Sequence, residues 1–203
     1  MNRLWLAAVG AVLVLLGGCG GAGSGDSDVD LHISAKPVPS DPCALVGIDA
    51  FAQVMPNPEE IRRDESFAPV VPLDGVNVAV CRVDAGAGEA RGSQLVMLVA
   101  RYGDSGGKSG TAWAEDLTTK ECADDRNKLG PTGGDLAADV LAGLGDQSCG
   151  VRDPGSSQRV IDYKLRVRRG RDEVSLDVTR VAGDADTPKH LAMLVRTVFD
   201  KLP

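Results

Sequence analysis

Histidine and cysteine, the side chains that most often serve as general bases, nucleophiles and metal ligands, are scarce in this chain. Its 203 residues include two histidines and five cysteines. His32 lies in a glycine-rich stretch, and His190 is expected in the first turn of a C-terminal helix, where a surface or capping role is the ordinary one. We therefore expect no serine or cysteine nucleophile activated by histidine, and we assign no catalytic residue.

Four of the cysteines, Cys43, Cys81, Cys122 and Cys149, are widely separated along the chain. In an oxidising compartment an even number of cysteines forms disulfides, and four cysteines allow three pairings. We favour Cys43–Cys81 with Cys122–Cys149, because each bridge then stays within one half of the chain. A four-cysteine zinc site needs pairs only about two to four residues apart. The spacing therefore argues against a metal ion, and we expect no cofactor.

The first residues of the chain have the pattern of an export signal. Met1-Asn2-Arg3 supplies a basic start, and an unbroken run of apolar residues and glycine extends from Leu4 to Leu16. This run of about 13 residues is too short for a membrane-spanning helix, which needs roughly 20 residues. We assign residues 1–18 to a cleavable signal peptide.

The signal ends in Leu16-Gly17-Gly18-Cys19, which resembles the lipobox of bacterial lipoproteins. The resemblance implies that the Cys19 thiol receives a diacylglyceryl group and that Cys19 becomes the new amino terminus after cleavage. An ordinary secretory signal with a chance cysteine is the alternative. Residues 19–38 then comprise the lipidated cysteine and a flexible glycine-rich tether. Through the lipid on Cys19 the protein would contact the cell membrane, on its extracytoplasmic face.

The remaining residues, 39–203, suit a single extracytoplasmic domain. The chain is acidic, with a formal net charge of −7, and only 3% of its residues are aromatic. An acidic domain without a basic face argues against nucleic acid as a partner. With so few aromatic residues the core must be aliphatic, so we expect the two disulfides to supply a large share of the stability.

Carboxylates are plentiful, and two of them facing one cleft can hydrolyse glycosides. The adjacent pairs Glu59-Glu60, Asp124-Asp125 and Asp172-Glu173 have side chains that point different ways, so we interpret them as solvated surface. Four arginines gather at the tip of an expected hairpin: Arg166, Arg168, Arg169 and Arg171. Pairing with acids is their ordinary role, and contact with an acidic polymer or phospholipid headgroups is the alternative.

The clearest elements lie in the last third of the chain. Apolar residues alternate with polar ones over 161–167 and again over 174–178, on either side of Arg169-Gly170. This period of two predicts a hairpin with one buried face. A turn centred on Arg169-Gly170 predicts three apolar pairs: Leu165 with Val174, Tyr163 with Leu176, and Ile161 with Val178. On the opposite face, Arg166 then meets Glu173.

A C-terminal helix is expected to begin at Thr187-Pro188, with Thr187 as its N-cap. Its apolar residues from Leu191 to Leu202 follow helical spacing and should lie across the hairpin. Further elements are predicted in the rest of the chain: helices at 48–55, 111–123 and 136–141, and strands at 76–83, 94–102 and around Cys149. Together these elements predict an α+β fold, an antiparallel sheet with a C-terminal helix packed on one face and stapled by disulfides.

Several of these motifs together resemble an actinobacterial lipoprotein family catalogued as domain of unknown function 3558. The resemblance is carried by short motifs: the lipobox ending at Cys19, Asp41-Pro42-Cys43, Cys81, Gly143-Leu144-Gly145-Asp146, the hairpin at 168–170 and the C-terminal helix. The chain is also similar, more distantly, to extracellular sensor domains of mycobacterial receptor kinases, which the segment around Trp113 and Cys122 resembles more. The similarity to the sensor domains implies a disulfide-bonded α+β domain with a cleft for a ligand. The lipoprotein family has no established catalytic residues that could be carried over to this chain.

These observations predict a non-catalytic ligand-binding or sensing module on the outer surface of the cell membrane. Its ligand would be a small molecule, a lipid or an envelope protein. Two alternatives stay open. One is a structural or accessory envelope protein without a ligand. The other is a carboxylate-based hydrolase, which requires two acids from distant segments facing one cleft.

Overall fold

The computed structural model describes residues 36–55, 62–63, 75–85, 92–154, 160–182 and 184–203. The predicted signal peptide, Cys19, His32 and Glu59-Glu60 lie outside these ranges. Within them, no helix has both the length and the apolar character needed to cross a membrane. Val38, at the end of the expected tether, is only 8% exposed and belongs to the core. The folded part therefore includes residues slightly before position 39.

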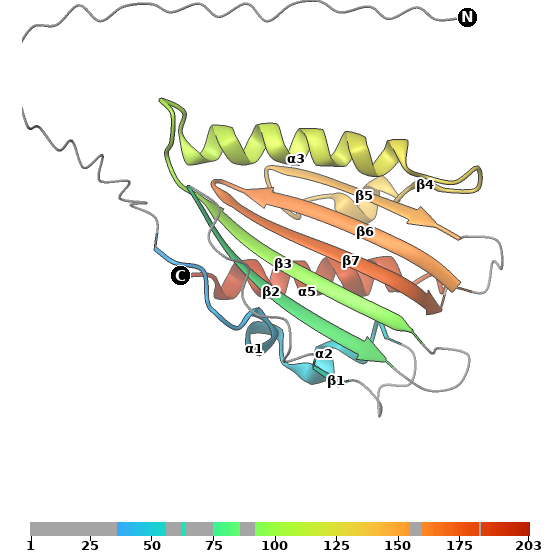
Figure 1. Cartoon of the computed structure of the whole chain (residues 1–203). Coiled ribbons are helices and arrows are strands. Elements are labelled where there is room, and N and C mark those ends of the chain that lie inside the picture. The colour runs from blue at the N-terminus through green and yellow to red at the C-terminus, as the bar shows by residue number, and fades with distance from the viewer. Residues whose placement is uncertain (1–35, 56–61, 64–74, 86–91, 155–159, 183) are drawn as a thin grey trace, which may run out of the picture. The chain divides into compact units, whose positions relative to one another are not determined.

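One antiparallel sheet organises the domain, with its strands in the order β1-β2-β3-β7-β6-β5-β4 (Figure 1). Five strands are long: β2 (Val76–Ala85), β3 (Ser93–Tyr102), β5 (Gln147–Asp153), β6 (Val160–Arg169) and β7 (Asp172–Ala182). The two edge strands are short: β1 (Arg62–Arg63) and β4 (Gly134–Asp135). The predicted antiparallel sheet is confirmed.

Helices lie on both faces of this sheet (Figure 1). The core face carries α1 (Pro42–Val46), α2 (Ile48–Phe51) and α5 (Thr187–Lys201), and the short α4 (Ala138–Leu141) contacts α5 at one side. The opposite face, which we call the α3 face, carries α3 (Gly110–Asn127) alone among the described helices. The α+β fold with a C-terminal helix on one face is therefore confirmed.

Alternation along the strands separates the two faces chemically. On β7, Val174, Leu176 and Val178 point to the core face and are at most 1% exposed. Burying one such aliphatic side chain stabilises a fold by roughly 1.5–3 kcal/mol. As expected, the main core is mostly aliphatic, and its only aromatic members among the described residues are Phe51, Tyr163 and Phe199.

Each predicted disulfide fastens a helix to one face of the sheet. Cys43 on α1 is bonded to Cys81 on β2, and Cys122 on α3 is bonded to Cys149 on β5. Both expected pairings are confirmed. Because the first bridge lies on the core face and the second on the α3 face, the sheet carries a covalent staple on each side.

The hairpin of β6 and β7 forms with a register two residues away from the predicted one. Leu165 pairs with Leu176 rather than Val174, and Tyr163 pairs with Val178. The turn is Gly170-Arg171 instead of Arg169-Gly170, because Gly170 takes the positive φ of 61° that a tight two-residue turn requires at its first position. A shift of two residues keeps every side chain on its face, so the predicted buried face is still correct.

The C-terminal helix begins as expected but is capped differently. Thr187 is its first residue and not its N-cap, a position held by Asp186, whose side chain makes no capping hydrogen bond. Asp184 does the capping: its Oδ1 accepts hydrogen bonds from the backbone N–H groups of Asp186 and Thr187 at 2.8 and 2.7 Å. The predicted apolar stripe is confirmed, since five of its six residues are buried: Leu191, Leu194, Val195, Val198 and Phe199.

The Gly143-Leu144-Gly145-Asp146 motif fixes the loop before β5 against the hairpin tip. Leu144 is fully buried, and a Cβ on Gly145 would overlap the carbonyl oxygen of Arg168. Asp146 Oδ2 accepts a hydrogen bond from the backbone N–H of Gly170 at 2.7 Å. In this chain the motif therefore has a structural role.

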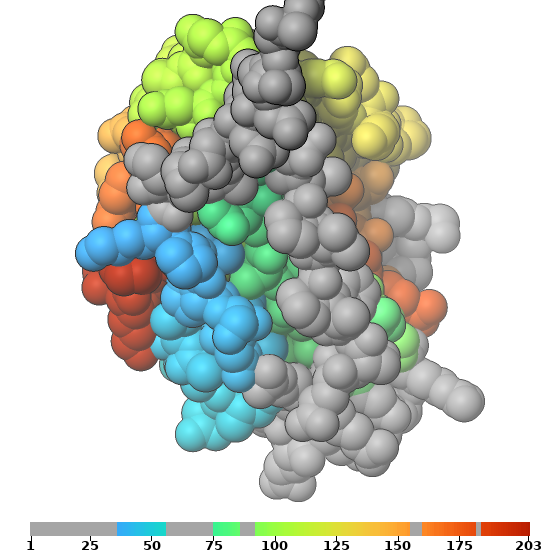
Figure 2. Space-filling model, turned by 60° about the vertical axis from the view of Figure 1, so that its left-hand side comes forward, coloured from blue at the N-terminus to red at the C-terminus, as the bar shows by residue number. Residues whose placement is uncertain are grey.

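The first and last described residues meet at a single buried arginine. Arg101 is 5% exposed and forms a two-pronged ion pair with Asp172, with nitrogen–oxygen distances of 2.6 and 2.9 Å. Its guanidinium also donates to the carbonyl oxygens of Lys36 at 2.9 Å and Pro203 at 3.0 Å. Figure 2 shows the blue residues after position 36 beside the red C-terminal residues.

Candidate functional site

The helix α3 is positioned by small and polar side chains, together with a disulfide. Its buried positions lie along one side of the helix: Gly110, Ala114, Thr118, Cys122 and Asp125. Gly110 permits a close approach to β3, because a Cβ there would overlap the carbonyl oxygen of Tyr102. Ser109 caps the first turn, accepting a hydrogen bond from the backbone N–H of Ala112 at 3.2 Å.

A groove of about 430 Å³ lies between α3 and the sheet, and we call it the α3 groove. Its apolar lining consists of Val76, Val78, Val96, Leu98, Ala100 and Leu117. Its polar lining consists of Tyr102, Glu121, Arg166, Glu173, Ser175 and Asp177. The volume falls within the range of roughly 300–1,000 Å³ that is usual for small-molecule sites.

Arg166 on β6 lies at the centre of the polar end, in contact with three carboxylates. Its Nε donates to Asp125 Oδ2 on α3 at 2.7 Å, and its Nη1 forms an ion pair with Glu121. The same Nη1 lies 3.6 Å from Glu173 Oε1 on β7. One guanidinium therefore joins three carboxylates from two separate elements, which fixes α3 relative to the strands.

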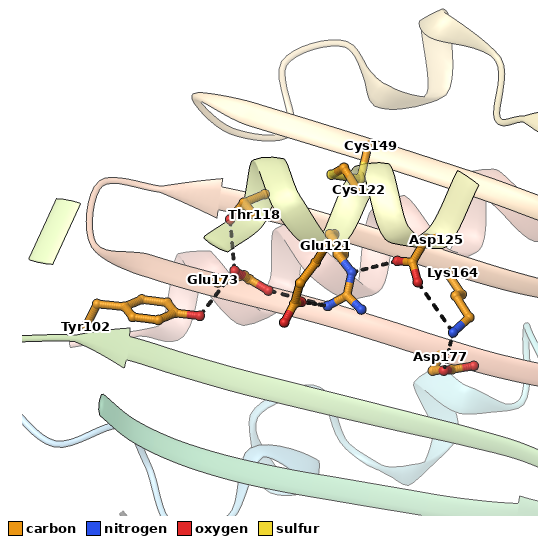
Figure 3. Close-up of polar contacts among 10 residues, drawn as sticks. Tyr102, Thr118, Glu121, Cys122, Asp125, Cys149, Lys164, Glu173 and Asp177 are labelled. Carbon is orange, nitrogen blue, oxygen red and sulfur yellow. Dashed lines mark hydrogen bonds and ion pairs between the residues drawn. A yellow bond between two sulfur atoms is a disulfide. The ribbon is translucent and has the colours of Figure 1, made fainter. Parts of the chain in front are cut away.

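Glu173 is the most deeply buried carboxylate of this group, at 2% exposure. Its Oε2 accepts hydrogen bonds from the Thr118 hydroxyl at 2.8 Å and the Tyr102 hydroxyl at 3.3 Å (Figure 3). Burial raises the pKa of Glu173, although the hydrogen bond from Thr118 acts in the opposite direction. Burial, together with the charge of Glu173, also raises the pKa of Tyr102 and keeps its hydroxyl protonated as a donor.

Lys164 extends the network along β6. Its Nζ lies 3.1 Å from Asp177 Oδ2 and 3.5 Å from Asp125 Oδ1 (Figure 3). Partial burial acts to lower the pKa of Lys164, but the charges of Asp177 and Asp125 outweigh it and the pKa is raised. Both cations of the network are therefore held in the charged state with their partners.

The burial of Asp125 and Glu173 corrects the expectation that these acids are solvated surface. Asp125 is 4% exposed and Glu173 2%. Each belongs to an adjacent pair whose two side chains do point different ways, as expected, but Asp125 and Glu173 turn inward. They do so because Arg166 on the neighbouring strand supplies a counter-charge under α3. Asp172, the neighbour of Glu173, is also only 17% exposed, since it pairs with Arg101. In the sequence, the alternation of charged and apolar residues along β6 and β7 was the signal that could have indicated these inward-facing carboxylates.

The four hairpin arginines all pair with acids, which confirms their ordinary role. Besides Arg166, Arg168 lies 3.3 Å from Asp146, and the other two make longer contacts at 3.7 and 3.8 Å with Asp200 and Asp104. They therefore do not form a free basic patch. His190 is also in an ordinary position, with its Nδ1 2.9 Å from the carbonyl oxygen of Gln53.

A serine motif went unnoticed in the sequence: Gly103-Asp104-Ser105-Gly106-Gly107 matches the spacing G-x-S-x-G and lies between a strand and a helix. Ser105 is bridged to Lys108 by two backbone hydrogen bonds of 3.0 Å in a turn with two glycines at positive φ. His190 lies in the first turn of α5, whereas Arg101, which precedes this loop, contacts Pro203 just beyond the other end of that helix. Within the part of the chain that the structure describes, Ser105 therefore has no histidine to activate it.

A second hollow, of about 580 Å³, lies between α4, the β5–β6 strands and the start of α5. It is more open than the α3 groove, and its charged residues include Asp139, Arg152 and Lys189. These side chains belong to the surface and do not form a buried network. In the described parts of the chain, no group of three or more histidine, cysteine or acidic side chains is placed to hold a metal ion.

The α3 groove is thus the site where buried polar groups and an apolar surface meet. Glu121 from α3 and Glu173 and Asp177 from β7 line it together, which the sequence could not indicate because these residues lie about 50 positions apart. Comparison of the chain with models of known protein families, with characterised proteins and with solved structures finds no match. Any function must therefore be argued from the groove and from the N-terminal sequence.

Proposed function

We propose that the chain is a lipoprotein anchored through Cys19 to the extracytoplasmic face of a cell membrane, and that its domain binds a ligand in the α3 groove without transforming it. The observation that supports binding most directly is the groove itself. Its floor is an apolar strip of β2 and β3, and its wall is a helix held by Cys122–Cys149. Sites of this kind, apolar with a few convergent polar groups, are the usual form of ligand pockets.

The state of the carboxylates favours binding over catalysis. Glu173 already accepts two hydrogen bonds and lies beside Arg166, so its oxygens are occupied. Arg166 is itself engaged by three acids. A general acid or nucleophile must reach the substrate directly. The Glu173 carboxylate and the Arg166 guanidinium instead bind their neighbours in the protein, and these contacts stabilise the shape of the groove.

The anchor is supported by the N-terminal sequence, in which an export signal ends in Leu16-Gly17-Gly18-Cys19. Metabolic labelling with palmitate tests it. The unaltered chain should incorporate the label, and Cys19→Ser should abolish incorporation. Ser24→Ala, a matched change a few residues further on, should leave it unchanged. Labelling that persists in Cys19→Ser would refute the anchor.

Ligand binding is tested by mass spectrometry of molecules that co-purify with the chain from its own envelope. Val78→Trp would fill the groove, because Val78 lines it. Val80 follows two residues later on the same face of β2 but does not line the groove, so Val80→Trp is the matched control. We expect a molecule that is present with the unaltered chain and with Val80→Trp, and lost with Val78→Trp. If nothing co-purifies in any case, the accessory role without a ligand is the better account.

A carboxylate-based hydrolase is the second candidate, because Glu121 and Glu173 come from distant segments and line one groove. The purified chain would then hydrolyse peptidoglycan or an ester, and Glu121→Gln would abolish the activity. Glu115→Gln removes an exposed carboxylate from the same helix and is the control. Turnover that depends on Glu121 but not on Glu115 would replace the binding proposal.

A further inference from the structure

The α3 groove has two chemically different ends. Toward β2 and β3 its lining is aliphatic, with Val78, Val96 and Leu98 as the floor. Toward β6 and β7 it is ionic, with Glu121, Arg166, Glu173 and Asp177. A smaller hollow of about 240 Å³ shares Val76, Tyr102 and Leu117 with the groove and reaches Trp113. The apolar part therefore continues along α3 toward Trp113.

The ionic end carries more negative than positive charge. Four carboxylates gather there with two cations: Glu121, Asp125, Glu173 and Asp177 with Lys164 and Arg166. Both cations already have partners, since Arg166 contacts three of the acids and Lys164 contacts two. Even with Glu173 protonated, as its burial favours, one negative charge remains in excess.

The accessible carboxylates lie at the rim of the groove. The side chains of Glu121 and Asp177 are 41% and 48% exposed, whereas that of Arg166, which also lines the groove, is only 20% exposed. A molecule entering the groove with a charged head would meet carboxylate oxygens before it met the guanidinium. At a partly exposed site, these carboxylates would attract a positively charged head and repel a negatively charged one.

We infer that the α3 groove takes an aliphatic amphiphile whose head is a protonated amine. The chain would lie on Val78, Val96 and Leu98, and the ammonium would lie between Glu121 and Asp177. This inference rests on the proposed binding function and adds the class of the ligand to it. An anionic head of the same length would face the same carboxylates and be repelled.

Three probes with an identical eight-carbon chain test the inference: octylamine, octanoate and octyl glucoside. They are titrated calorimetrically against the chain carrying Cys19→Ala, which changes no described residue. We expect octylamine to bind at least about tenfold more tightly than octanoate, with octyl glucoside between them. The preference should shrink as salt is added, because the rim carboxylates are partly exposed.

Two variants locate the charge effect. Glu121→Gln and Asp177→Asn should each weaken the binding of octylamine by about threefold to tenfold and leave the affinity for octyl glucoside unchanged. Glu115→Gln, which alters net charge equally but lies on the exposed side of α3, should change neither. Octanoate binding as tightly as octylamine would overturn the inference, and so would an equal effect of Glu121→Gln and Glu115→Gln.

The pattern of failure separates the two proposals. If all three probes bind equally and Val78→Trp blocks them while Val80→Trp does not, the groove binds chains but the inferred amine head is wrong. If none of the probes binds, or if Val78→Trp changes nothing, the groove is not a binding site and both proposals fail. Val80→Trp also shows whether a tryptophan on this face of β2 is tolerated by the fold.

Discussion

Arg166 on β6 holds Asp125 on α3 by a hydrogen bond of 2.7 Å from its Nε, in a place where Asp125 is only 4% exposed. Removing one partner of a buried ion pair leaves an uncompensated charge and costs about 3–5 kcal/mol. We therefore expect Arg166→Met to lower the free energy of unfolding by that amount, measured by urea denaturation.

Arg171→Met is the control for this change. Arg171 is 37% exposed and lies 3.8 Å from Asp104, so its loss should cost less than about 1 kcal/mol. Equal losses for the two variants would show that the buried network does not hold α3 to the sheet.

Glu173 should make stability depend on pH. Its pKa is raised in the folded state by burial, so the folded chain holds this proton more tightly than the unfolded chain. The contribution of Glu173 to the free energy of unfolding is thus fully present below the ordinary pKa of about 4.5 and is lost as pH rises through the raised pKa. Glu173→Gln should remove this fall, as measured by denaturation at a series of pH values. The difference in free energy of unfolding between the unaltered chain and Glu173→Gln should therefore change with pH above about 4.5. A difference that stays constant would contradict the effect of burial on the pKa of Glu173. Glu115→Gln, which changes an exposed carboxylate, is the reference variant.

The start of α5 depends on Asp184 rather than on the residue at the N-cap position. Asp184 accepts from two backbone N–H groups, so Asp184→Ala should cost about 1 kcal/mol of stability. The Asp186 side chain contacts Lys189 at the surface, so Asp186→Ala should cost clearly less stability than Asp184→Ala, as is usual for exposed pairs. Thermal unfolding of the two variants distinguishes them, and a larger loss for Asp186→Ala would assign the cap differently.

The capping carboxylate also gives an acid-side prediction. Partial desolvation opposes ionisation, but the hydrogen bonds from Thr187 and Asp186 outweigh it and lower the pKa of Asp184. Its stabilising effect is therefore present above the ordinary pKa and is lost as pH falls through the lowered one. The stability difference between the unaltered chain and Asp184→Ala should accordingly shrink in acid.

Gly145 is required where its loop crosses the β6 backbone. Gly145→Ala would place a methyl group on the carbonyl oxygen of Arg168, so we expect a loss of about 1–3 kcal/mol. A Cβ on Gly134 would meet nothing within 4 Å, so Gly134→Ala should change stability little. Chemical denaturation compares the two, and equal stabilities would show that the loop can move away from the strand.

The two disulfides should contribute similarly to the free energy of unfolding, but their removal should affect binding in the groove differently. In the chain-entropy model, bridges across 38 and 27 residues stabilise by about 3.5–4 kcal/mol each. Replacing Cys122 and Cys149 by serine should also free α3 and weaken octylamine binding. Replacing Cys43 and Cys81 should lower stability while leaving binding intact wherever the chain stays folded. Loss of octylamine binding in both double variants would mean that binding depends on the stability of the whole domain rather than on the position of α3.

The sequence predicted the faces of the strands more reliably than their pairing. The period of two along β6 and β7 requires only that Leu165 and Val174 share a face, and any even shift satisfies it. The register depends on which residue of the turn takes a positive φ, and Gly170 can occupy either position of a two-residue turn. Both disulfides followed from the sequence, because the bridges join elements close in chain order.

The groove could not be predicted, because the buried side of α3 has no apolar stripe. Trp113, the largest apolar residue of the helix, is 36% exposed, and the side facing the sheet carries Ala114, Thr118 and Asp125. Buried acids of this kind depend on a counter-charge from another strand, which local patterns do not contain. Small residues spaced by four along the helix, with Cys122 among them, were the signal that could have revealed that side.

The carbonyl oxygens of Lys36 and Pro203 are bound by the one guanidinium of Arg101. The first and last described residues of the domain therefore lie close together in space. A short peptide joining these ends, with a new opening elsewhere, should give a circularly permuted chain with an unchanged sheet.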